Sequence, residues 1–131
     1  MLRAIFGNSN RSGHLRMSLC LSLALAGVGV AWLSPWVLVA SIACWVQELW
    51  ATADRDLEEK RRHKSWYWLP FGWLVSHRSW VSHGLVWGTV IRLAYGLWPV
   101  LLGLYLVAPP LALAWVFGAL VNDLGHLALD L

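Results

Sequence analysis

Long uncharged stretches alternate with polar segments along this chain, and they predict its helices. Residues 17–47 contain no Asp, Glu, Lys, Arg or His, and residues 84–107 contain a single charge, Arg92. A third run, 111–122, is also uncharged. The hydrocarbon core of a bilayer is roughly 30 Å thick and takes about 20 apolar helical residues to cross. Runs of this length and composition therefore indicate helices in a membrane.

The first uncharged run contains a break at Ser34-Pro35. One straight helix over all of it would be about 46 Å long, which exceeds the thickness of the bilayer core. Serine followed by proline fits an N-cap and the first position of a new helix. We therefore predict two short helices, at about 15–33 and 35–51, with one kinked helix as the alternative.

Two further helices are expected, at about 84–107 and 111–130, with a turn forced by the two prolines between them. The prediction is thus a single domain over residues 1–131. Its fold class is all-α, an integral membrane helical bundle with about four transmembrane or membrane-embedded helices. The charged segment 52–83 is expected to be a loop.

Basic residues set the expected topology and partners. The 52–83 loop carries six Lys or Arg residues and the first 16 residues carry three, whereas 108–110 carries none. The positive-inside rule then places the N-terminus, this loop and the C-terminus on the cytoplasmic side of the inner membrane. The net charge of +3 fits contact with the lipid bilayer and anionic headgroups better than nucleic-acid binding.

Tryptophan is abundant, with 11 residues in 131. Five of them lie next to or within the charged loop, where the stretch SWYWLPFGWL (65–74) is typical of a segment at headgroup level. An aromatic belt of this kind explains the composition without a bound chromophore. A pigment or quinone pocket is the alternative.

With four helices, the side chains able to bind a metal gather near one membrane face. Histidine nitrogens and carboxylate oxygens are ligands of zinc, manganese and iron. A mixed shell with an open position suits a metal that activates water. The last three candidates follow i, i+3, i+7 spacing and so share one helix face. The candidates are His14, Asp54, Asp56, His77, His83, Asp123, His126 and Asp130.

Each candidate also has an ordinary structural role. An Asp-x-Asp after a helix is typical of a solvated loop, and a single His at a helix start often caps it. A carboxylate within a membrane helix costs at least about 2.5–3.5 kcal/mol on insertion scales, so Asp123 should have a partner. Arg92 is the candidate partner, and their ion pair would stabilise the bundle without a metal.

The segment WYWLPFGWLVSHRSWVSHG, followed by GTVIRLAY, resembles a family of uncharacterised metal-binding membrane proteins with an HRSxxSHG motif. More distantly, the chain is similar to the LexA-regulated membrane-bound metal-dependent hydrolases. The resemblance implies a divalent metal, zinc in the first place and Mn or Fe as alternatives. It also implies the ligands Asp54, Asp56, His77, His83, His126 and Asp130, with His14 a looser match and Arg78, Arg92 and Asp123 in support.

Two functions from different classes follow. In the first, the metal activates water to hydrolyse a phosphoester, and Arg78 holds the phosphate, unless it only anchors the chain to headgroups. In the second, the chain is a non-catalytic accessory subunit or assembly factor of a larger membrane complex. Ala53 in place of the family's proline and Arg55 between the two carboxylates favour the second. A pigment-bearing subunit is a third possibility.

Overall fold

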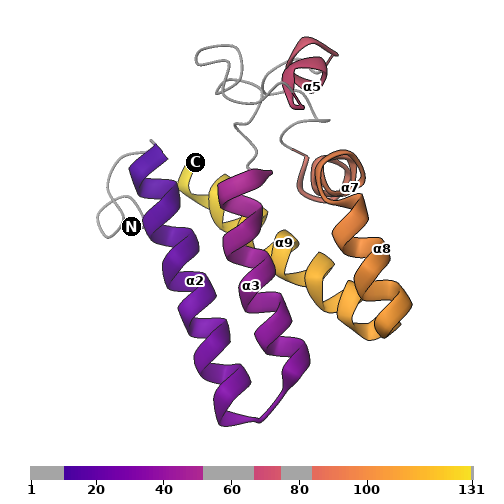
Figure 1. The fold of residues 1–131 in the computed structure, drawn as a ribbon. Helices are drawn as coiled ribbons and strands as arrows, with labels where there is room; N and C mark the ends of the chain where they lie inside the picture. The colour runs from indigo at the N-terminus through magenta and orange to yellow at the C-terminus, as the bar shows by residue number, and fades with distance from the viewer. Residues whose placement is uncertain (1–10, 52–66, 75–83, 131) are drawn as a thin grey trace.

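Every element in the described part of the chain is a helix, as the sequence predicts (Figure 1). The computed structural model describes residues 11–51, 67–74 and 84–130. The predictions for 52–66 and 75–83 lie outside these residues. In chain order the helices are α2 (Arg11–Ala31), α3 (Pro35–Trp50), α5 (Leu69–Leu74), α7 (Leu85–Gly96), α8 (Trp98–Val107) and α9 (Pro109–Asp130).

A tight turn joins α2 to α3, and the predicted break at Ser34-Pro35 is confirmed. The Ser34 N–H donates to the Gly29 carbonyl at 2.8 Å, and the Leu33 N–H donates to the Val30 carbonyl at 3.2 Å. These two bonds form a Schellman motif, with Leu33 in the left-handed conformation at φ 49°. Ser34 is extended and Pro35 opens α3, where its missing N–H removes no helical hydrogen bond.

The first helix begins at Arg11, earlier than the predicted start at 15. Gly13 and His14 are buried in its first turns, so His14 lies inside the helix rather than before it. Packing of these residues against the rest of the bundle outweighs the weak helix propensity of glycine.

The predicted single helix over 84–107 is wrong, because α7 and α8 meet at an angle of 88°. Pro99 has no N–H to donate to the Tyr95 carbonyl, so the helical ladder is interrupted there. The Tyr67 hydroxyl donates to that carbonyl instead. The next carbonyl, of Gly96, accepts a bond from Trp50 Nε1 at 3.2 Å. The break is therefore stabilised by side chains of other segments.

Helix α9 begins with the two prolines and crosses the other helices closely. A Cβ at Gly118 would lie 2.0 Å from the Ala40 carbonyl oxygen of α3, and one at Gly125 would lie 2.7 Å from Leu21 Cδ1 of α2. Small residues at such spacing let helix backbones approach, as is common in membrane bundles. Helix α3 accordingly packs against both α2 and α9.

The aromatic segment expected at headgroup level is partly buried. Trp68 is fully buried and Phe71 nearly so, whereas Trp73 is exposed. The Trp68 ring occupies the place where a Cβ on Gly96 would lie, 2.4 Å from the ring. Tyr95 Oη also donates to the Tyr67 carbonyl at 2.6 Å. These contacts attach the segment that contains α5 to α7, and they correct the prediction that 52–83 is only a loop.

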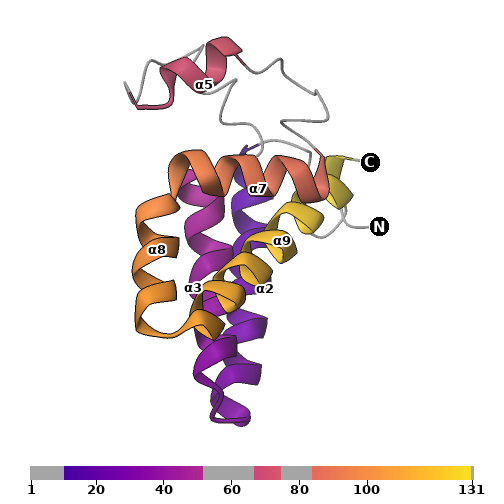
Figure 2. The same ribbon diagram turned by 90° about the vertical axis from the view of Figure 1, so that its right-hand side faces the viewer.

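Two helices, α2 and α9, are long and apolar enough to cross a membrane, and α7 with α8 is a third candidate if the bent pair is one span. Helix α3 has 16 residues, fewer than the about 20 that a full crossing requires. Figure 2 shows α7 lying across one end of the bundle while α8 runs alongside it. The described residues thus support two or three spans rather than four.

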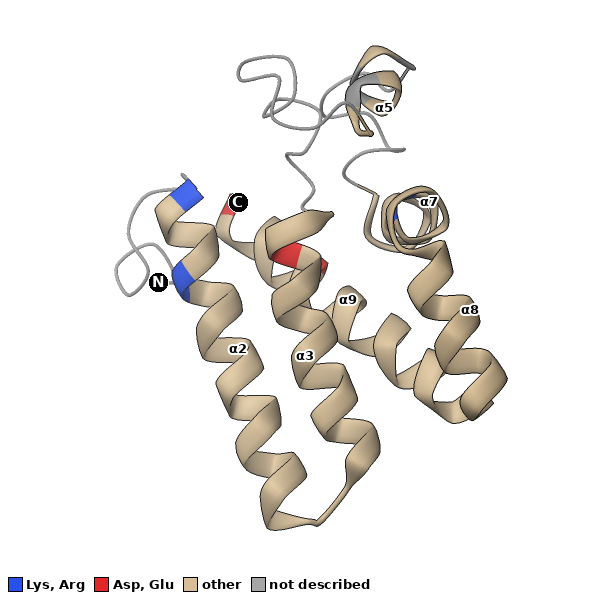
Figure 3. Cartoon of the chain, in the orientation of Figure 1, with Lys and Arg blue, Asp and Glu red and all other residues tan. Residues whose placement is uncertain are grey.

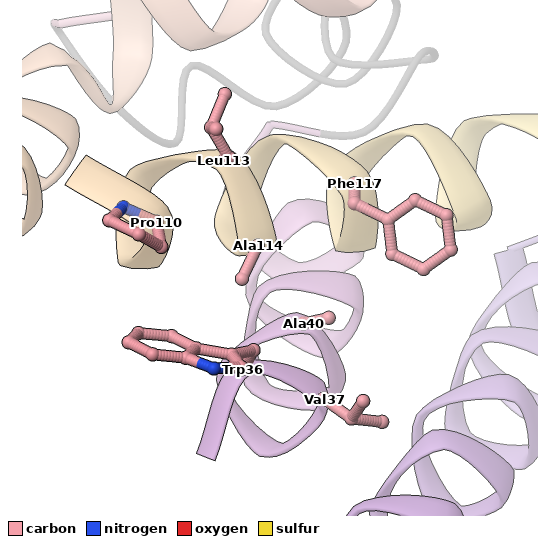
Figure 4. Close-up of a pocket in the computed structure, with 7 residues that line it drawn as sticks. All are labelled: Trp36, Val37, Ala40, Pro110, Leu113, Ala114 and Phe117. Atoms are coloured by element: carbon pink, nitrogen blue, oxygen red, sulfur yellow. The ribbon is translucent and has the colours of Figure 1, made fainter. Parts of the chain in front are cut away.

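Charge is confined to one half of the bundle (Figure 3). This half contains the start of α2 and the ends of α3 and α9. The end with the α2–α3 turn has only uncharged residues. There, a cavity of roughly 350 Å³ lies between the first turns of α3 and α9 (Figure 4), and none of its lining residues is titratable. It is lined by Trp36, Val37, Ala40, Pro110, Leu113, Ala114 and Phe117.

Candidate metal centre

The last turns of α9 present a histidine and a carboxylate on one face. His126 and Asp130 are four residues apart, so their side chains lie one above the other. His126 Nε2 lies 3.6 Å from Asp130 Oδ2. The His126 side chain is 1% exposed and that of Asp130 is 28% exposed. The pair is thus buried at its inner end and accessible at its outer end.

Helix α2 adds a second histidine to this pair. His14 Nε2 lies 3.3 Å from Asp130 Oδ1, so the two carboxylate oxygens face different imidazoles. The rings of His14 and His126 stack with their centroids 3.7 Å apart and their planes 14° apart. One donor atom from each of the three residues lies within 4.8 Å of the other two. We call these three residues the His/Asp cluster.

The donor set of the His/Asp cluster fits a divalent metal. Zinc binds histidine nitrogen and carboxylate oxygen at about 2.0–2.2 Å, so neighbouring ligands in a tetrahedral site lie about 3.3–3.6 Å apart. The two nitrogen-to-oxygen distances, 3.3 and 3.6 Å, have this spacing. Three protein ligands also leave a fourth position open, as in catalytic zinc sites.

A second carboxylate lies next to the cluster. Glu48 Oε2 of α3 is 3.7 Å from His126 Nδ1. Asn122 Nδ2 donates to the same oxygen at 3.3 Å, and the Ser18 hydroxyl donates to Asn122 Oδ1. Glu48 is only 6% exposed, although the sequence suggested that this end of α3 runs out into the interface. The charge is therefore held by polar groups from α9, and Ser18 of α2 orients one of them.

Asp123 belongs to a separate polar group on the other side of α9. Its Oδ2 lies 2.5 Å from an Arg92 guanidinium nitrogen, which is the ion pair expected from the sequence. The Thr89 hydroxyl also donates to this oxygen, and Gln47 Nε2 lies 3.5 Å away. All four side chains are buried. Burial of a charge is tolerated when it is paired and hydrogen-bonded, so this group ties α7 to α9 and α3.

The structure brings together three of the predicted metal residues, His14, His126 and Asp130. His14, which the sequence placed only in a supporting role, lies at the centre of this cluster. Arg92 and Asp123 pair with each other instead. The remaining predicted residues lie outside the described part of the chain and stay predictions. They are Asp54, Asp56, His77, Arg78 and His83.

Sequence reasoning missed Glu48, Asn122 and Ser18. A signal for the last two was present, because polar residues recur every four positions along otherwise apolar helices. In α2 the series is His14, Ser18, Ser22, and in α9 it is Asn122, His126, Asp130. Such a stripe marks a helix face that turns away from lipid and toward polar partners.

These features define an all-helical protein whose longest helices are apolar enough for a membrane and whose polar end contains a possible His/Asp metal site. The family described as "Uncharacterized metal-binding protein (DUF2227)" matches residues 11–129, and the chain belongs to this family. The match includes all three residues of the His/Asp cluster except Asp130, which lies one position beyond it. No curated protein and no solved structure matched the chain. The similarity to LexA-regulated hydrolases stays a prediction.

Proposed function

We propose that this protein binds one divalent cation, zinc in the first place, through His14, His126 and Asp130. The observation that carries the proposal is the convergence of both imidazole Nε2 atoms on the two oxygens of one carboxylate, at 3.3 and 3.6 Å. Two histidines and a carboxylate suit zinc, and they also suit manganese or iron. Asp54, Asp56, His77 and His83 are proposed as further ligands.

The test is a zinc titration of the purified protein in detergent micelles, with manganese and iron(II) in parallel. We expect one tight site, and a large loss of affinity in His126→Ala. Ser41→Ala is a suitable control, because Ser41 and Ser22 join α2 to α3 through their own hydrogen bonds. Equal affinity of wild type and His126→Ala would reject the assignment of the site.

We further propose that the bundle is embedded in the inner membrane by four helical segments, with the metal centre at the cytoplasmic face. Arg11 and Arg16 begin α2 at the same end as the His/Asp cluster, which agrees with the positive-inside rule. The lipid bilayer is then the constant partner, with a larger membrane complex as a second one. Reporter fusions at both termini should give cytoplasmic signals. Termini on opposite sides would reject this topology.

Hydrolysis of a phosphoester, such as a phospholipid headgroup, is the second candidate function. Its support is the partial exposure of Asp130, 28%, next to a ligand set with an open position. Zinc supplies Lewis-acid activation of water. Asp130 would leave the site accessible from its outer end, and Arg78 would hold the phosphate. Turnover of a phosphodiester that stops on chelation would support hydrolysis. Metal binding without turnover would favour the non-catalytic accessory subunit.

A further inference from the structure

The two nitrogens of the His126 ring face two different carboxylates. Nε2 faces Asp130 Oδ2 at 3.6 Å, on the side of the His/Asp cluster. Nδ1 faces Glu48 Oε2 at 3.7 Å, on the opposite side. Glu48 is not among the three residues whose donor atoms come together in the described part of the chain. It therefore lies behind the ring rather than at the metal position.

Hydrogen bonds fix the orientation of Glu48. The Ser18 hydroxyl donates to Asn122 Oδ1, so the amide nitrogen of Asn122 points the other way. That nitrogen donates to Glu48 Oε2 at 3.3 Å. The same oxygen faces His126, and the residues of this chain come from α2, α9 and α3. The carboxylate is thus held in place by three helices before any metal binds.

We propose that Glu48 is a positioning residue for the metal centre. It accepts the Nδ1 proton of His126, selects the tautomer with a free lone pair on Nε2, and so directs that atom toward Asp130 and His14. Histidines that bind metals commonly donate their other N–H to a carboxylate, which fixes the ring and makes the ligand more basic. This inference rests on the proposed metal binding.

The buried environment of Glu48 supports this role over a purely structural one. Glu48 is the only charged residue of α3, and it is 6% exposed on a helix that is otherwise apolar or neutral. An apolar residue or glutamine would avoid the cost of burying a charge, which is several kcal/mol per ion in proteins. A carboxylate at this place gains from a partner that donates a proton, and His126 is the ring that it faces.

The first test reads the tautomer in the metal-free protein. Nitrogen-15 NMR of histidine, at an alkaline pH where free imidazole is neutral, should show His126 with its proton on Nδ1. In Glu48→Leu, which removes the acceptor, the population should shift toward the Nε2–H form. Ser41→Ala, on the same helix, should keep the wild-type signal. A wild type already in the Nε2–H form would overturn the inference without involving the metal.

The second test compares zinc affinities by competition with a chromophoric chelator. Loss of such an outer partner weakens metal binding about 10–100-fold, so we expect this loss in Glu48→Leu and a smaller one in Glu48→Gln, which still offers an oxygen. Ser41→Ala should bind zinc as the wild type does. If Ser41→Ala weakens binding equally, Glu48 acts only through the stability of the bundle and the inference is wrong.

The outcomes separate this inference from the function on which it rests. If the wild type binds zinc and both Glu48 variants bind it equally well, the positioning role is wrong and metal binding stands. If the wild type binds no metal, the proposed function fails and the positioning role fails with it.

Discussion

The imidazole rings of His14 and His126 stack with their centroids 3.7 Å apart, although they come from the first and the last described helices. No short sequence motif contains both residues, so the His/Asp cluster exists only when α2 and α9 are packed together. A metal bound there contacts both ends of the fold. Metal binding and folding stability are therefore coupled in this protein.

This coupling predicts that zinc stabilises the bundle. At a free zinc concentration of 100 times Kd, a ligand that binds only the folded state adds about 2.7 kcal/mol to the free energy of unfolding. Unfolding in mixed micelles, with and without zinc, measures this gain. His14→Ala should lose most of it, and magnesium should give little in the wild type. An equal gain in His14→Ala would show that zinc binds elsewhere.

Asp130 faces both histidines, and its partial exposure makes it a mild site for substitution. Asp130→Asn should lower zinc affinity at least about tenfold, the loss known for even indirect partners of a metal. Its helix content, measured by circular dichroism, should not change. Arg16→Gln alters an exposed charge of the same end and serves as the control. The role of Asp130 as a ligand is excluded if both variants bind zinc like the wild type.

The Arg92–Asp123 pair should matter for stability and not for the metal. Arg92→Met leaves a buried carboxylate without its cation, which costs about 3–5 kcal/mol. Replacing both residues, in Arg92→Met/Asp123→Leu, should recover part of this loss. Zinc affinity of the folded variants should stay near that of the wild type. A loss below about 1 kcal/mol in the single variant, the value for exposed pairs, would contradict a buried pair.

Gly118 allows α9 to approach α3, and a methyl group there should separate the helices. In Gly118→Ala the new Cβ would meet the Ala40 carbonyl oxygen at 2.0 Å, so the backbone must move. We expect a loss of about 1–3 kcal/mol, typical of overpacking. Gly103→Ala is the matched control, because nothing lies within 4 Å of its Cβ. Ala is the better helix former by about 0.5–1 kcal/mol, so that control should be neutral or stabilised.

The sequence predicted the parts of this fold that depend on local chemistry. Ser34-Pro35 marked the start of α3, since a proline fits the first turn of a helix and interrupts a longer one. The same reasoning should have divided α7 from α8 at Pro99, but the uncharged run around it indicated one continuous span. Hydropathy reports which residues avoid water and not the direction of a helix, so the bend of 88° could not be read from it.

The candidate site was predictable only in its local half. His126 and Asp130 share a helix face by their spacing, and this is visible in the sequence. The approach of His14 depends on how α2 packs against α9, which the spacing of residues does not specify. Glu48 looked like the polar end of an apolar helix, and only the contacts with Asn122 and His126 give it another role.

The most direct test of the central claim is the metal content of the purified protein. Elemental analysis of the wild type in detergent, after removal of loosely bound ions, should give about one zinc, manganese or iron per chain, which is what one His/Asp cluster can hold. His14→Ala/His126→Ala should contain none, while Ser41→Ala should match the wild type. A wild type without stoichiometric metal, or a double variant with as much metal as the wild type, would contradict a metal centre at this cluster.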